Sequence, residues 1–150
     1  MYRVFLFLIL LAASGCAHCD RDEKFLFDLS LAREYYLNGK FGEAIQKFED
    51  AVEKCPDSYD AILGLAIADR DWGMVKFTEA EDLYRVKKIE FAKKEFTKAS
   101  NIHKVAEKLF LKAIQMRPDD MLAYRELGIF YYKRATSPYG YPFRLDDTEN

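Results

Sequence analysis

The sequence predicts an all-α fold in which helix hairpins stack on one another. Apolar residues recur at helical spacing through most of the chain, and no stretch alternates apolar and polar residues for long enough to form a strand. One helix pattern also occurs twice, 62 residues apart. In this pattern small residues let two helices approach closely, an aromatic ring fills the groove between them, and a proline ends the helix. The two copies are Ala44, Phe48, Ala51, Val52, Pro56 and Ala106, Phe110, Ala113, Ile114, Pro118.

The first fifteen residues have the features of an export signal. Arg3 precedes an apolar run over residues 4–13, which is shorter than the roughly 20 residues that a membrane-spanning helix needs. Residues 13–16 resemble a bacterial lipobox, in which the cysteine receives palmitate-type lipid and becomes the mature N-terminus. We therefore expect a lipoprotein signal peptide over residues 1–15. An ordinary signal peptide cut near Ala17 is the alternative.

The same resemblance predicts a location for the mature protein. Cys16 would carry the lipid, and residues 16–24 would form a linker to the folded part. Since Ala17 rather than an aspartate follows the cysteine, lipoprotein sorting rules imply the periplasmic face of the outer membrane. Half of the residues are apolar and the net charge is only −2, which argues against a nucleic-acid partner.

The first repeating unit is predicted to span residues 25–58. Its first helix begins near Phe25, a turn follows at Asn38 and Gly39, and the second helix covers residues 42–54. Proline disfavours a helical conformation in the residue before it, so Pro56 ends this helix. The unit is therefore expected to be one antiparallel hairpin.

These residues resemble the tetratricopeptide repeat (TPR) family. That family's first helix carries a leucine, a small residue and a tyrosine, and its second helix carries alanine, an aromatic residue, alanine and a closing proline. Residues 124–131 repeat the first-helix pattern. The resemblance implies a short solenoid of stacked hairpins whose usual role is to bind another protein. The matching positions in the first unit are Leu31, Ala32, Tyr35, Gly39, Phe41, Ala44, Phe48, Ala51 and Pro56.

The second unit, residues 59–118, is longer than a compact repeat. Its first helix is expected at about residues 59–72 and its second at about residues 101–117. Between them, Thr78 and Glu81 have the spacing of a capping box, and no glycine or proline interrupts the run to Ser100. We expect one long basic helix over about residues 78–99, inserted inside this repeat. A degenerate pair of repeats is the alternative.

A last helix over residues 121–134 has no partner helix after it, so Ile129 and Phe130 would be exposed unless another segment covers them. The ends of stacked arrays need a polar or covered face. The tail, residues 135–150, carries aromatic residues between prolines and is expected to fold back as a cap. A flexible end that orders only on binding is the other interpretation.

The cysteines suggest a disulfide rather than catalysis. Cys16 and Cys19 have the spacing of a thiol redox pair, but they adjoin the cleavage site and lipidation would consume Cys16. Cys19 and Cys55 are expected at adjacent ends of the first hairpin, where a disulfide between them would staple it. The alternative is that Cys55 is a small buried apolar residue at the end of the hairpin. His18 and His103 have no second histidine at ligand spacing, so no metal site is expected. No cofactor or nucleophile motif is present, and the chain is predicted not to be an enzyme.

The TPR resemblance places the functional surface on the inner groove. Arginines there are expected to hold carboxylates of a protein segment between apolar anchors. The predicted function is a membrane-tethered scaffold for an envelope assembly, pilus or secretion complex, with self-association as an option. The alternative is an accessory of solute uptake that binds a small apolar ligand or a substrate-binding protein. The groove residues carried over are Arg33, Tyr36, Leu37, Asp60, Leu63, Ile67, Arg70, Arg125, Ile129, Tyr132 and Lys133.

Overall fold

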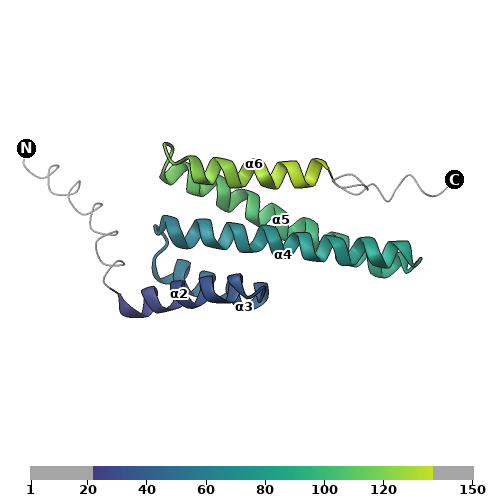
Figure 1. Cartoon of the computed structure of the whole chain (residues 1–150), viewed down its shortest axis with the longest axis horizontal. Coiled ribbons are helices and arrows are strands. Elements are labelled where there is room, and N and C mark those ends of the chain that lie inside the picture. Colours follow the sequence, from purple (N-terminus) through teal and green to yellow (C-terminus); the bar gives the residue numbers. More distant parts are fainter. Residues whose placement is uncertain (1–21, 137–150) are drawn as a thin grey trace, which may run out of the picture.

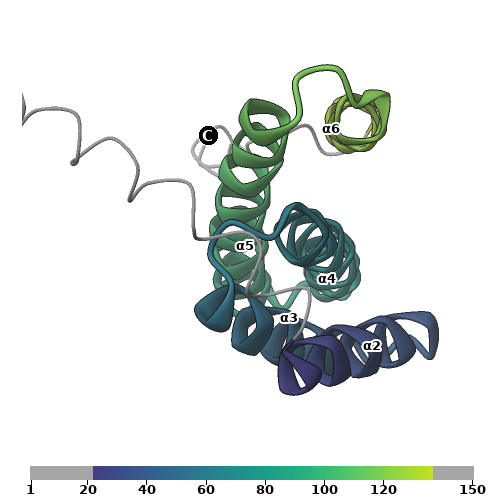
Figure 2. The same cartoon turned by 90° about the vertical axis from the view of Figure 1, so that its left-hand side faces the viewer.

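The computed structural model describes residues 22–136, which contain five helices and no strand. The predicted all-α class is therefore confirmed. Figure 2 shows α2, α4 and α6 along one side of the stack, with α3 and α5 behind them. No helix in this part of the chain is long and apolar enough to cross a membrane. The helices are α2 (Glu23–Leu37), α3 (Phe41–Lys54), α4 (Tyr59–Arg85), α5 (Ile89–Met116) and α6 (Met121–Ala135), shown in Figure 1.

Side-chain caps begin three of these helices. The carboxylate of Asp22 accepts hydrogen bonds from the first turn of α2, Ser58 does the same for α4, and Asp120 for α6. Gly39 has a φ of 71° and makes the turn between α2 and α3. A left-handed conformation is easily reached only by glycine, so the predicted hairpin over residues 25–58 forms where the sequence indicates.

The first hairpin packs its core through small and aromatic residues. Ala32, Ala44 and Ala51 are fully buried, and the Phe48 ring lies among them with 3% of its surface exposed. A Cβ atom at Gly64 would lie 2.3 Å from this ring, so only glycine lets α4 approach Phe48 so closely. The pattern found in the sequence therefore forms the contact that stacks α4 on the first hairpin.

The predicted helix over residues 78–99 is wrong, and so is the alternative of two degenerate repeats. α4 continues through Thr78, whose hydroxyl donates to the Met74 carbonyl instead of capping a new helix. The chain turns once, at Val86 to Lys88, and α5 then runs to Met116. Residues 59–116 are therefore one hairpin with elongated helices, of 27 and 28 residues against 15 and 14 in the first hairpin.

The elongated hairpin is held together by a packing pattern that repeats every seven residues, here called the seven-residue step. On α5, buried alanines alternate with large rings, and on α4 small residues recur opposite them. A Cβ atom at Gly73 would lie 2.3 Å from the His103 ring, which shows how closely the two helices approach. Figure 1 shows the far end of this hairpin projecting beyond the other helices. The residues of the step are Ala92, Phe96, Ala99, His103, Ala106, Phe110 and Ala113 on α5, with Ala66, Gly73 and Ala80 on α4.

The last helix forms as predicted and packs on the second hairpin. Phe130 is fully buried there, whereas Ile129 is 36% exposed. The outer face of α6 keeps Met121, Tyr124 and Gly128 at the surface. The predicted tail cap, residues 137–150, lies outside the described residues, and so does the whole N-terminal signal and linker up to residue 21.

Candidate functional site

A pocket opens on the inner side of α2, α4 and α6. Its volume is about 250 Å³. The floor is apolar and comes from three helices and from the ring of Phe48 on α3, which reaches it because Gly64 has no side chain. Arg33 and Asp60 form its polar edge. The lining residues are Arg33, Tyr36, Phe48, Asp60, Leu63, Gly64, Ile67 and Leu122.

The charged edge of the pocket can rearrange at little cost. Arg33 Nη2 lies 3.5 Å from Asp60 Oδ2, and both side chains are more than half exposed. Exposed ion pairs of this kind contribute only about 0–1 kcal/mol. A partner can therefore replace either half of the pair with a charge of its own.

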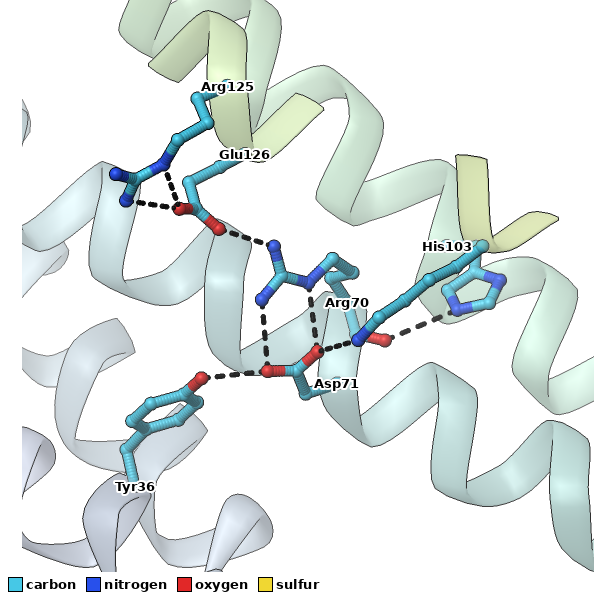
Figure 3. Close-up of polar contacts among 7 residues, drawn as sticks. Tyr36, Arg70, Asp71, His103, Arg125 and Glu126 are labelled. Atoms are coloured by element: carbon cyan, nitrogen blue, oxygen red, sulfur yellow. Dashed lines mark hydrogen bonds and ion pairs between the residues drawn. The ribbon is translucent and has the colours of Figure 1, made fainter. Parts of the chain in front are cut away.

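A network of buried polar groups closes one end of the inner face (Figure 3). Arg70 donates two hydrogen bonds to Asp71, at 2.9 and 3.0 Å, and a third to Glu126 Oε2 at 2.6 Å. The hydroxyl of Tyr36 donates to Asp71 Oδ2 at 2.7 Å. Arg125 donates to the other oxygen of Glu126 at 2.8 and 3.1 Å. Because these residues come from α2, α4 and α6, the network fixes the spacing of the three helices that line the pocket.

Each carboxylate of this network is paired with cations inside the protein. Burial raises the pKa of Asp71 and of Glu126. The hydrogen bonds and charges of Arg70, together with those of Tyr36 and Lys133 at Asp71 and of Arg125 at Glu126, outweigh burial, so both pKa values are lowered. Burial and the bond to Asp71 raise the pKa of Tyr36 to about 12, so it remains a donor. Lys133 Nζ lies 3.5 Å from Asp71 Oδ1 and adds a further cation. The network is therefore complete without a ligand.

The structure brings five of the predicted groove residues to the pocket and leaves the others elsewhere. Arg70 is only 5% exposed and fully engaged, so the expectation that it would hold a partner's carboxylate is wrong. Lys133 is tied to Asp71, whereas Leu37 is 82% and Tyr132 is 69% exposed, outside the pocket lining. Those at the pocket are Arg33, Tyr36, Asp60, Leu63 and Ile67.

Sequence reasoning missed the residues that complete the site. Leu122 lies on the same face of its helix as the predicted Arg125 and Ile129, three and seven residues later, so helical spacing could have found it. Asp71 and Glu126 carry no such signal, because their roles depend on contact with Arg70 across the stack.

The remaining candidates do not assemble a reactive site in the described residues. His103 is 1% exposed, and burial lowers its pKa to about 4, so its ring stays neutral. No cluster of three or more potential metal ligands occurs between residues 22 and 136. Cys55 is buried at the end of α3 and is disulfide-bonded. Cys16 and Cys19 lie outside the described residues, so the lipidation and the pairing with Cys19 stay predictions.

Comparison with known proteins supports the repeat inferred from the sequence. The tetratricopeptide repeat family matches residues 27–68, which comprise most of α2, all of α3 and the start of α4. No curated protein and no solved structure matches the chain. The matched segment includes the Phe48 contact with Gly64 and seven of the eight residues that line the pocket, all except Leu122. Residues 27–68 are therefore similar to the tetratricopeptide repeat family, and the helices of the described chain stack in an all-α, TPR-like fold.

Proposed function

We propose that this protein is a membrane-tethered adaptor that holds a segment of a partner protein along the face formed by α2, α4 and α6. The observation that carries the proposal is the apolar pocket with a loosely paired charged edge. Stacked helical repeats generally serve as protein-binding surfaces. A pocket of about 250 Å³ suits one large side chain of a bound peptide or helix.

The charges around the pocket indicate what flanks that side chain. Arg33 and Arg125 have exposed side chains, whereas Arg70 is buried and engaged. An aromatic or aliphatic anchor with a carboxylate nearby would therefore fit best, because Arg33 can exchange Asp60 for the partner's group. The export signal and the lipobox-like residues 13–16 support a partner in an envelope assembly, pilus or secretion complex.

The size of the pocket weighs against the uptake alternative. Sites that enclose small molecules usually measure about 300–1,000 Å³, and this pocket is both smaller and open on the stack's inner side. TPR proteins are mostly scaffolds without catalytic activity, and the proposal assigns none to this chain.

Site-specific photo-crosslinking in cells tests the proposal. A photoreactive residue at Ile67, in the pocket, should capture a defined protein, while one at Lys108, exposed on α5, should not. The captured segment, made as a peptide, should bind the purified protein, and Ile67→Glu should weaken that binding at least tenfold with an unchanged helical spectrum. Capture of lipid alone, or a peptide affinity indifferent to Ile67→Glu, would contradict the proposal.

A further inference from the structure

The tip of the α4–α5 hairpin combines exposed apolar and basic side chains. Val86 is 63% and Phe91 is 66% exposed, on either side of the turn. Neither belongs to the small core inside the projection, formed by Phe77, Ala80, Ala92, Phe96 and Ala99. Apolar side chains this exposed contribute little to the packing of the hairpin. The basic residues around them are Arg85, Lys87, Lys88, Lys93 and Lys94.

Three of these cations have no charge partner in the described part of the chain. Arg85 pairs with Asp82 at 3.2 Å and Lys93 pairs with Glu90 at 3.3 Å, each within its own helix. No ion pair between residues 22 and 136 includes Lys87, Lys88 or Lys94. The tip therefore presents a net positive charge to its surroundings.

Lys87 also holds an unfavourable backbone conformation. Its φ is 62°, and it occupies the same place in its turn as Gly39 does in the first hairpin. The two turns make equivalent hydrogen bonds: Gly39 N–H donates to the Tyr36 carbonyl and Lys87 N–H to the Tyr84 carbonyl. Glycine would adopt this conformation without strain. A lysine kept where glycine fits better points to a use for its charge.

We propose that this tip binds an anionic membrane surface. Val86 and Phe91 would enter the interfacial region, and Lys87, Lys88 and Lys94 would contact lipid phosphates. A stable protein interface buries about 800 Å² on each partner, whereas the exposed large apolar side chains at this tip are only Val86 and Phe91. A membrane interface accepts single apolar side chains and gains about fivefold in affinity for each nearby lysine. The surface is thus distinct from the pocket between α2, α4 and α6.

The position of the tip defines how the protein would lie. Figure 1 shows the tip at the opposite end of the long axis from the start of α2. A chain tethered through its N-terminus can bring the tip to the same membrane when the long axis lies along the surface.

Vesicle binding by a chain that starts at Ala17 tests the inference. This chain lacks the predicted lipid site but retains Cys19, and all three clusters of buried residues lie within Phe25 to Phe130. It should bind vesicles containing phosphatidylglycerol, release them at high salt, and ignore pure phosphatidylcholine. Replacing Lys87, Lys88 and Lys94 together by glutamine should weaken binding about a hundredfold. The matched control replaces the exposed Lys24, Lys104 and Lys108, with the same change in net charge.

A single substitution separates the proposed role from a structural one. Lys87→Gly should raise the melting temperature, because it relieves the backbone, and should weaken vesicle binding about fivefold. Equal losses in the tip and control triple variants, or no binding to anionic vesicles, would overturn the inference. The inference would also be overturned if the tip bound an acidic protein while the tip-lysine variants bound anionic vesicles as well as the wild type does. Failure of the Ile67 crosslinking would leave this inference unaffected, since the two surfaces share no residue.

Discussion

Replacing Gly73 by alanine should destabilise the protein, although alanine is the better helix former. The new Cβ would lie 2.3 Å from His103 Cδ2 and 2.5 Å from Nε2. His103 cannot easily yield, because it is 1% exposed, packs edge-on against Phe130 at 5.3 Å, and has Nε2 at 3.3 Å from the Arg70 carbonyl. Overpacking of this kind costs about 3 kcal/mol at the upper end, and alanine's propensity offsets about 1, so we expect a net loss of about 2 kcal/mol.

Gly128 provides the matched control, because it is also a helix glycine. Nothing lies within 4 Å of a Cβ atom built there. Gly128→Ala should therefore stabilise the protein by about 1 kcal/mol. Urea denaturation followed by circular dichroism would measure both changes in unfolding free energy. In thermal denaturation, each kcal/mol shifts the melting temperature by about 4 °C.

A double-mutant cycle identifies the cause of the loss at Gly73. In a His103→Ala background the obstructing ring is gone, so Gly73→Ala should become stabilising by about 1 kcal/mol. The contact between Gly73 and His103 would then account for the sign. If Gly73→Ala stabilises the wild-type chain as Gly128→Ala does, or still destabilises it without His103, the packing argument fails.

Three further predictions concern two buried polar groups and the predicted disulfide. Arg70→Met should cost about 3–5 kcal/mol in denaturation experiments, because it removes the buried cation that Glu126 shares with Asp71 and leaves Glu126 only the exposed Arg125. A second change of Glu126 to leucine should recover part of the loss. Burial raises the pKa of Asp69 to about 7. The folded state therefore holds a proton there that the unfolded chain has already lost, and its stability falls as the pH rises from about 4 to 7. Asp69→Asn should abolish this loss and be more stable than the wild type at pH 8. Cys19→Ser should cost about 3 kcal/mol if Cys19 pairs with Cys55, and non-reducing mass analysis that finds Cys19 free would show that the pairing is wrong.

The parts of the fold that were predictable carry local stop signals. The first hairpin has Asn38 and Gly39 at its turn and Pro56 after its second helix, and the last helix begins beside its cap, Asp120. These residues act within a few positions of where they stand, through backbone conformation and capping. A single sequence therefore indicates them well.

The long hairpin was misread because its turn has no such signal. Lys87 takes a conformation that sequence reasoning assigns to glycine, so nothing marked the reversal of the chain. One signal was present: Ala92, Phe96 and Ala99 repeat the spacing of Ala106, Phe110 and Ala113 fourteen residues earlier.

The site was only partly predictable for a different reason. Helical spacing places Arg33, Leu63 and Ile67 on inner faces, and the structure has them at the pocket. The engagement of Arg70 depends on Glu126, which lies 56 residues away in the chain and reaches it only through the stacking of α6. No local pattern distinguishes an arginine that faces solvent from one that meets a buried carboxylate across the stack.

The seven-residue step explains how the hairpin can be long without disturbing the pocket. Buried alanines at Ala92, Ala99 and Ala106 return to one side of α5, since two residues seven apart lie nearly above one another on packed helices. An extension of fourteen residues therefore preserves the face that α5 turns toward α4. An extension far from a whole number of helical turns would rotate His103 and Phe110 away from the small residues that receive them. The inner face and the tip are thus two ends of one continuous helix pair, whose packing holds them at a fixed separation.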